Sequence, residues 1–255
     1  MEPTKPNQNT PDLQPQSTSP RFLYHGTSES RAVGILEHGL TPRSQNGHKN
    51  WSNESHDWLV YLSECYAPYF GANASKDGER LAVIEVDVSK LDQQRLLPDE
   101  DFLEQASRFQ KDLFEVEGIS MEERTRYFRD NIEIFAHHWE DSLCGLGNCA
   151  YAGPIGIEAI SRVALFDHSK NQASKWIFLA LCDPTISLMN YRLCAEKYRA
   201  INRWVMGYKD FDCGQMAGPV SSAFQQDMVE EMNQMLSDQS SVDVIYERSR
   251  QKGHD

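Results

Sequence analysis

Residues Arg21–Ser28 read RFLYHGTS, and this stretch decides how the chain starts to fold. Its aromatic and apolar first half predicts a short strand that ends at His25. Gly26 follows directly, and the absence of a side chain there lets another molecule or segment approach the backbone. Thr27 or Ser28 then suits the N-cap of a helix. The stretch therefore predicts a strand that runs straight into a tight turn and a helix.

Strands and helices alternate after this start. Ala32, Val33, Ile35 and Leu36 have helical spacing, and Gly39 after His38 is placed to end that helix. Leu81–Val88 is largely apolar and β-branched, which predicts a strong strand. The remaining predictions are strands at Trp58–Ser63 and Ile160–Phe166, a short strand within 145–160, helices at Glu64–Ala74 and Met121–Trp139, and a loop that turns helical within Leu97–Gln105.

This order predicts an α+β fold: a small split antiparallel sheet with helical insertions and a helical C-terminal extension. Helices are predicted in the extension at 177–182, 190–206 and 221–236. We expect three parts: a disordered leader at 1–20, a catalytic domain at 21–168, and the extension at 169–255 packed on that domain. The leader is rich in Pro, Gln, Asn, Ser and Thr, so it has little apolar surface to bury.

Composition narrows the class of protein. Hydrophobic residues make up 40% of the chain and charged residues 25%, as in soluble globular proteins. No apolar run approaches the ~18 residues of a membrane span, and the leader lacks the apolar region of a secretory signal. The six cysteines form no C-x-x-C pair, which favours reduced thiols in the cytoplasm and no metal site. The net charge of −13 weakens long-range attraction to nucleic acid.

A few side chains stand out for their chemistry. His25 at a strand end can exchange hydrogen bonds with a ribose hydroxyl, and the open backbone at Gly26 suits a carboxamide. Tyr61 lies in the next strand and Tyr69 on the helix after it, and their rings can enclose a flat heterocycle. Taken singly, these residues also fit an ordinary strand-end histidine and core tyrosines.

Their order favours the functional interpretation. The sequence His25-Gly26-Thr27, a helix that ends at Gly39, Tyr61 in the next strand and Tyr69 on the following helix resembles the ADP-ribosyltransferase superfamily. The closest similarity is to the branch with a His, Tyr and variable-residue motif. That branch contains poly(ADP-ribose) polymerases, rifampicin-modifying transferases, DNA-modifying toxins and RNA 2′-phosphotransferases. The resemblance covers 22–166 and implies NAD⁺ as co-substrate.

The resemblance also implies roles for the residues that match the motif. His25 would hold the 2′-hydroxyl of the adenosine ribose, Gly26 would pair through its backbone with the nicotinamide carboxamide, and Thr27 would support the turn. Tyr61 would pack at the nicotinamide end, and Tyr69 would stack over the ring.

Arg43, just after the first helix, would reach the pyrophosphate of NAD⁺. Arg31 is the second candidate for this contact.

The catalytic carboxylate is where the sequence departs from the motif. Breaking the bond between nicotinamide and ribose leaves positive charge on the ribose, which a nearby carboxylate stabilises. Asn148 occupies the position where many relatives carry glutamate. Either this position is non-acidic, as in the phosphotransferases, or the acid comes from Asp99, Glu100 or Asp101, as it does from a comparable loop of the rifampicin-modifying transferases. We favour the acidic loop; the alternative is a solvated start of a helix.

The acceptor of ADP-ribose is the least determined part. A transferase of this size resembles bacterial or phage effectors, namely toxins of toxin–antitoxin systems or anti-phage factors, so a neutralising antitoxin is a candidate partner. We favour a nucleic-acid base over a protein side chain as acceptor. Two alternatives stay open: an RNA 2′-phosphotransferase, and a degenerate module that binds NAD⁺ or ADP-ribose without chemistry.

Overall fold

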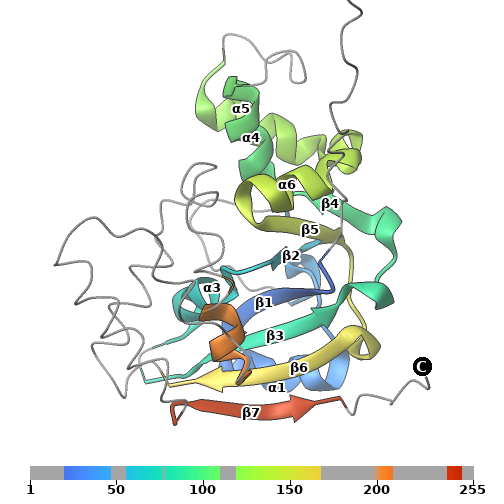
Figure 1. Ribbon diagram of the computed structural model, residues 1–255. Helices are drawn as coiled ribbons and strands as arrows, with labels where there is room; N and C mark the ends of the chain where they lie inside the picture. The colour runs from blue at the N-terminus through green and yellow to red at the C-terminus, as the bar shows by residue number, and fades with distance from the viewer. Residues whose placement is uncertain are drawn as a thin grey trace, which may run out of the picture.

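A seven-stranded antiparallel sheet organises the chain, with the strand order β4-β5-β2-β1-β3-β6-β7 (Figure 1). The computed structural model describes residues 20–46, 56–76, 78–109, 119–167, 199, 201–208 and 240–248. The strands are β1 (Phe22–Ser28), β2 (Leu59–Ser63), β3 (Leu81–Asp87), β4 (Leu96–Pro98), β5 (Asn148–Ala152), β6 (Ile160–Phe166) and β7 (Val242–Glu247). The α+β class predicted from the sequence is confirmed.

Helices cover both faces and one end of the sheet. The α-helices are α1 (Glu29–His38), α2 (Arg43–Asn46), α3 (Ala67–Ala74), α4 (Glu100–Phe109), α5 (Met121–Asp130) and α6 (Trp139–Leu146). The 3₁₀ helices are η1 (Val88–Lys90), η2 (Gln93–Arg95), η3 (Ile132–His138) and η4 (Ile157–Ala159). In Figure 1, α4, α5 and α6 gather at the end of the sheet that holds β4 and β5, whereas α3 lies over β1 and β3.

The sheet divides between β1 and β2. Strand β1 pairs with β3 along its whole length, and β2 pairs with β5 along its whole length. Between β1 and β2, however, the pairing consists of Tyr24 opposite Ser63 alone. Continuing that register would place Gly26 opposite Tyr61, but the two backbones are not paired. The two parts of the sheet therefore diverge from a single shared point.

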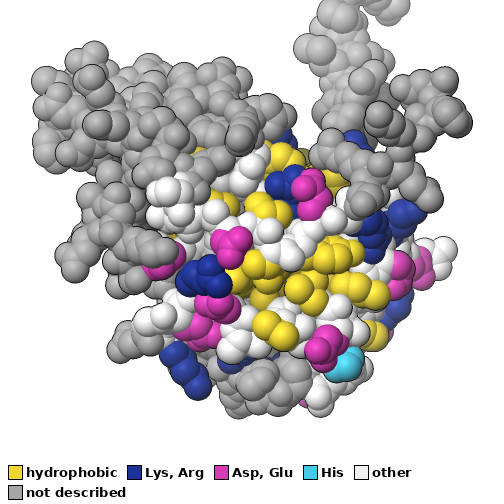
Figure 2. All heavy atoms as spheres, turned by 90° about the horizontal axis from the view of Figure 1, so that it is seen from below, with side chains coloured by type: hydrophobic (Ala, Val, Ile, Leu, Met, Phe, Trp, Pro, Cys, Tyr) yellow, Lys and Arg dark blue, Asp and Glu magenta, His cyan; other side chains and the backbone are white. Residues whose placement is uncertain are grey.

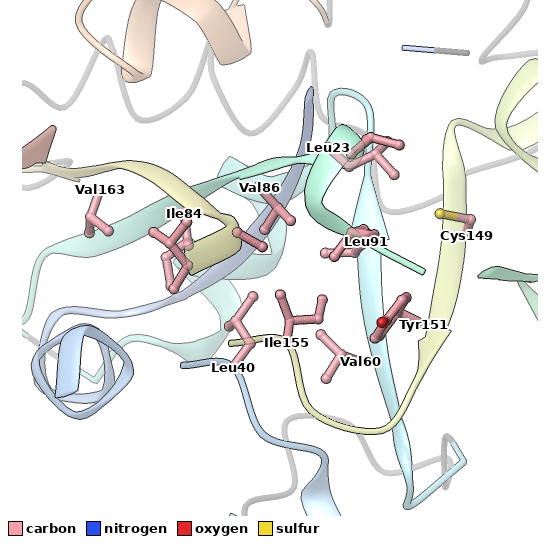
Figure 3. Packing of buried hydrophobic residues seen from close by; sticks show 14 of the residues in the cluster. Leu23, Leu40, Val60, Ile84, Val86, Leu91, Cys149, Tyr151, Ile155 and Val163 are labelled. Carbon is pink, nitrogen blue, oxygen red and sulfur yellow. The ribbon is translucent and has the colours of Figure 1, made fainter. Parts of the chain in front are cut away.

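One hydrophobic cluster underlies both parts of the sheet. Leu23, Ile84 and Val86 come from the β1–β3 part, and Val60 and Tyr151 come from the β2–β5 part (Figure 3). The bridge between Leu40 and Ile155 joins the chain after α1 to the chain after β5 beneath them. The divergence of the strands is therefore closed by packed side chains on the α1 face of the sheet.

The strong strand predicted at Leu81–Val88 is the centre of this packing. Leu81, Ala82, Val83 and Ile84 of β3 have no exposed surface. Helix α1 ends as predicted at Gly39, whose φ is +80°, and a Cβ there would lie 2.3 Å from the Ile155 carbonyl oxygen. Both the backbone conformation and the close approach therefore require glycine at this position.

The single helix predicted at Met121–Trp139 is wrong after Asp130. Helix α5 begins as expected, with a capping box between Ser120 and Glu123. It ends at Asn131, whose side-chain amide donates to the Tyr127 carbonyl at 2.8 Å. Such a local side-chain bond competes with the helical backbone, and the chain continues as η3 and then α6.

Two strands were not expected. The predicted loop at the start of Leu97–Gln105 is the short edge strand β4, where Pro98 is tolerated because the edge position needs no N–H donor. The helical extension predicted for 169–255 is wrong at Val242–Glu247, because β7 pairs with β6 as part of the sheet. Its valine and isoleucine residues favour a strand. Of the predicted extension helices, residues 199 and 201–205 are helical, and 177–182 and 221–236 lie outside the described residues.

β7 and α1 lie lowest in Figure 1, and the view from below shows hydrophobic side chains gathered in the middle of that face (Figure 2). Val33 of α1 and Val244 and Ile245 of β7 are exposed. Among the helices of the described residues, none is long and apolar enough to cross a bilayer.

Candidate functional site

The Tyr61 hydroxyl and the Glu100 carboxylate form the central contact of the candidate site. Tyr61 lies on β2, and Glu100 is the first residue of α4. The hydroxyl oxygen is 2.8 Å from both carboxylate oxygens of Glu100. The backbone N–H of His56 donates to the same hydroxyl at 3.0 Å. Because the hydroxyl oxygen accepts from His56, its own hydrogen is directed at Glu100.

Burial changes the acidity of Glu100. Only 6% of the residue is exposed. Burial, followed by the nearby charge of Asp101, raises the pKa of the Glu100 carboxyl from 4.5 to about 7, although the hydrogen bond from Tyr61 acts in the opposite direction. A carboxyl group with this pKa can hold or release a proton near neutrality, which suits a general acid or base.

The structure separates the three carboxylates of the acidic loop into different environments. Asp99 is buried, and its Oδ1 accepts from the Asp101 backbone N–H at 2.8 Å, as a residue that caps α4 does. Burial, with the charges of Asp101 and Glu100, raises the pKa of Asp99 well above its usual range. Asp101 is exposed. Glu100 is thus the buried member whose side chain contacts Tyr61.

Asn148 lies beside this loop at the start of β5. The Ser142 hydroxyl donates to the Asn148 carbonyl at 2.7 Å and accepts from the Asp99 N–H at 3.0 Å, which ties the two segments together. The amide of Asn148 is buried, and its Oδ1 has no hydrogen-bond partner. A buried acceptor without a donor is costly, so Asn148 retains capacity to bind a donor group.

His25 meets Tyr61 at the point where the sheet divides. Its Nδ1 is 2.9 Å from the Tyr61 carbonyl oxygen. Burial lowers the pKa of His25, the Tyr61 carbonyl opposes this effect, and the charge of Arg31 adds to it. The ring is therefore neutral at neutral pH. Since a carbonyl only accepts, Nδ1 carries the proton and Nε2 is left as an acceptor.

The side chains of His25 and Tyr61 leave the sheet on opposite faces. His25 pairs with Ile84, which packs in the cluster on the α1 face. Tyr61 lies two residues from Ser63 and therefore shares a face with Tyr24, which packs under α3. The His25 ring thus reaches the backbone of Tyr61 from one face, while the Tyr61 hydroxyl reaches Glu100 on the other.

The remaining predicted residues lie around this junction. A Cβ on Gly26 would be 1.8 Å from the Ala67 carbonyl, so the backbone of α3 packs directly on this glycine. Thr27 is buried in β1. Tyr69 is 7% exposed and packs edge-on against Phe70, with ring centroids 5.7 Å apart.

The two arginines proposed for the pyrophosphate lie on different helices, Arg31 on α1 and Arg43 on α2. Arg43 begins the short helix α2, and the charge of Arg31 acts on His25.

Two residues with a part in the site were not predicted from the sequence. His56 supplies the backbone donor to Tyr61, and Ser142 connects Asp99 with Asn148. Their roles depend on contacts between segments 5 to 43 residues apart, and neither forms a motif. Within the described ranges, no three His, Cys, Asp or Glu side chains gather as they would around a metal ion, and Cys65, Cys144 and Cys149 are free thiols.

Comparison of the chain with protein-family models, curated proteins and solved structures finds no match.

Proposed function

We propose that this protein is an NAD⁺-dependent ADP-ribosyltransferase. The observation that carries the proposal is the junction at which the sheet divides, where His25 bonds to the Tyr61 carbonyl and the Tyr61 hydroxyl bonds to Glu100. These are the His and the Tyr of the motif that the sequence resembles, joined to one residue of the acidic loop. The division of the antiparallel sheet between β1 and β2 supports the proposal, since a small split antiparallel sheet was expected.

Two features of the geometry support the roles proposed for His25 and Gly26. The Nε2 of neutral His25 is an acceptor, which a ribose 2′-hydroxyl can use as its partner. The Gly26 backbone lies next to a strand with which it is not paired, so its polar groups suit the nicotinamide carboxamide. Tyr61 would line the nicotinamide end. The stacking role of Tyr69 and the pyrophosphate contact of Arg43 stay predictions.

Glu100 is the proposed catalytic acid–base residue. When the bond between nicotinamide and C1 of the ribose breaks, its electron pair leaves with nicotinamide, and the ribose carbon becomes cationic. The ionised Glu100 carboxylate would stabilise this charge and take the proton of the attacking acceptor. Asp99 would hold the start of α4, and the amide of Asn148 would supply a hydrogen bond without charge.

The alternatives receive less support from this site. A phosphotransferase needs several cations around the phosphate, whereas in the part of the chain that the structure describes a single arginine acts on His25 (Arg31) and a single arginine on Glu100 (Arg129). A module without chemistry has no use for a buried carboxyl group with a strongly shifted pKa, which more often marks a functional site. A nucleic-acid base stays our favoured acceptor.

Labelled NAD⁺ tests the proposal directly. The protein is incubated with labelled NAD⁺ and cell lysate, and samples are then digested separately with protease or nuclease. If the protein transfers ADP-ribose, a macromolecule in the lysate becomes labelled. Loss of that labelled macromolecule on treatment with nuclease but not with protease would identify nucleic acid as the acceptor. If no macromolecule is labelled above a sample that contains Glu100→Gln protein, the transferase proposal fails.

His25 gives a second test, by calorimetry with NAD⁺. His25→Ala removes one hydrogen bond to the ribose in a closed site, so affinity should fall by about 1–3 kcal/mol. Thr41→Ala serves as a control at a half-buried position outside the site. Equal affinity in wild type and His25→Ala would remove His25 from the binding site.

A further inference from the structure

The segment His56–Trp58 contacts the Tyr61 hydroxyl, which in turn bonds to Glu100. The His56 backbone N–H donates to the Tyr61 hydroxyl at 3.0 Å. The Trp58 indole N–H donates to Nε2 of the His56 ring at 2.9 Å, and the two rings meet edge-on with centroids 5.0 Å apart. The ring of His56 is thereby fixed on Trp58, and its backbone is fixed on Tyr61.

We propose that His56–Trp58 is a positioning latch for the Tyr61–Glu100 pair, and that the neutral form of the His56 ring keeps the latch closed. His56 and Trp58 are positioning residues in this proposal, because they act through Tyr61. The inference rests on the proposed function only in its activity measurement.

The hydrogen-bond chemistry of the two rings supports this inference. The indole N–H can only donate, so Nε2 of His56 must be unprotonated to accept from it. The proton of the neutral ring is therefore on Nδ1, which lies 3.7 Å from Oδ1 of Asp57, beyond hydrogen-bond distance. A second proton would have to go on Nε2, where it would face the Trp58 N–H. Two donors cannot bond each other, so protonation of His56 opens the latch.

The charges around His56 come from three elements. Asp57 is its neighbour in sequence, Arg129 and Asp130 lie at the end of α5, and Glu133 lies in η3. Burial lowers the pKa of His56. Asp57, Asp130 and Glu133 raise it, and Arg129 lowers it. The resulting pKa is below 6.5, so the ring is neutral at neutral pH and the latch opens only as the solution becomes acidic.

Closing the latch matters for the direction of the Tyr61 hydroxyl. With its oxygen occupied by the His56 N–H, the hydroxyl presents its hydrogen to Glu100, and this bond lowers the pKa of Glu100. If the His56 backbone shifts, the hydroxyl is free to rotate and the bond to Glu100 weakens. Opening the latch should therefore move the titration of Glu100 to higher pH and reduce the ionised fraction at neutrality.

Nuclear magnetic resonance on the whole protein tests the latch without any activity. The carboxyl carbon of Glu100 and the Trp58 indole N–H are followed from alkaline through neutral to acidic pH in wild type, Trp58→Phe, His56→Gln and His56→Leu. Glutamine can accept from Trp58 but does not titrate, whereas leucine can do neither. His138→Gln is the control, since the ring of His138 bonds to Asp141.

The latch predicts a Glu100 midpoint that is higher in Trp58→Phe and His56→Leu than in wild type, with His56→Gln closer to wild type. The Trp58 signal should shift in acid in wild type and in His138→Gln, but not in His56→Gln. Transfer in Trp58→Phe should fall about three- to tenfold in kcat with KM for NAD⁺ little changed, as loss of one hydrogen bond implies.

A Glu100 midpoint that is the same in wild type, Trp58→Phe and His56→Leu would overturn the latch, whatever the activity. The outcomes for the two proposals separate cleanly. Coupled titration with no detectable transfer supports the latch and opposes the transferase, and transfer without coupled titration does the reverse.

Discussion

Helix α4 carries two buried glutamates, Glu100 in its first turn and Glu104 in its second, and their surroundings differ in charge. Glu104 is 1% exposed, and it forms ion pairs with Arg108 at 2.6 Å and with Arg124 of α5 at 2.7 Å. Glu100 is 6% exposed, and its partner is the neutral hydroxyl of Tyr61. One turn of helix therefore separates a carboxylate matched by two cations from one held by a hydroxyl.

This difference shows how burial alone fails to identify a catalytic carboxylate. Removing a carboxylate from water is costly, and two guanidinium groups offset this at Glu104, which joins α4 to α5. Within the described part of the chain Glu100 has no such ion pair, and burial instead raises its pKa, so that the uncharged form is favoured. A carboxyl group in the second condition lowers stability when it ionises, and such groups concentrate at functional sites.

The largest expected effect is a loss of stability at the ion-paired residue, Glu104. Glu104→Gln leaves Arg124 at 18% exposure without its ion pair, and breaking a buried pair from one side costs about 3–5 kcal/mol. Denaturant unfolding measures this loss, with Arg108→Gln as a milder control because that arginine is 42% exposed. Transfer by the folded fraction should persist. A loss below about 1 kcal/mol would show that the pair is not what holds α4 to α5.

The pH dependence of protein stability tests the raised pKa of Glu100, the other member of this comparison. Its folded pKa of about 7 is above the ordinary 4.5, so the protonated form is favoured by folding. The stability that this group contributes is therefore complete below pH 4.5 and is lost as the pH rises through about 7. The total loss of unfolding free energy is at most about 3 kcal/mol.

Glu100→Gln should remove this dependence, so the variant should melt above wild type at about pH 8–9 and close to it at about pH 4. Melting curves across this range are the measurement. Parallel pH profiles in wild type and variant would mean that Glu100 ionises normally in the folded protein.

The third largest expected effect is on the rate of ADP-ribose transfer. Glu100→Gln should lower transfer by about 10²-fold, equivalent to about 2.7 kcal/mol, while NAD⁺ binding persists. Asp101→Asn at the exposed position should keep most of the rate, and Asp99→Asn should act mainly on stability through the cap of α4. Rates and affinities are measured in parallel, with Asn148→Ala alongside. An inactive Asn148→Ala with an active Glu100→Gln would place the catalytic group on β5.

Much of the fold was predictable because its local patterns are strong. The β-branched run of β3 and the apolar first half of β1 predict strands, and Gly39 ends α1 where a helix stop was expected. The failures have causes that hydrophobic periodicity does not indicate, one local and two in the tertiary structure. Asn131 ends α5 through a side-chain bond to the backbone, and β4 and β7 are short strands that depend on the neighbours with which they pair.

The candidate site was predictable only as a set of residue types. His25, Tyr61 and an acid in the run Asp99–Asp101 follow from the motif and its departure at Asn148. The choice of Glu100 from three adjacent carboxylates does not, because it depends on the direction in which the first turn of α4 presents each side chain to β2.

The sequence by itself determined the α+β class, the central strands and the candidate residues, because strand and helix patterns are carried by neighbours along the chain. Only the tertiary structure decided which carboxylate is buried against Tyr61, that His25 reaches the Tyr61 backbone rather than its ring, and that His56 supports the hydroxyl. Acidity and hydrogen-bond direction depend on burial and on partners that are 5 to 39 residues away, and these are set when the sheet and helices pack.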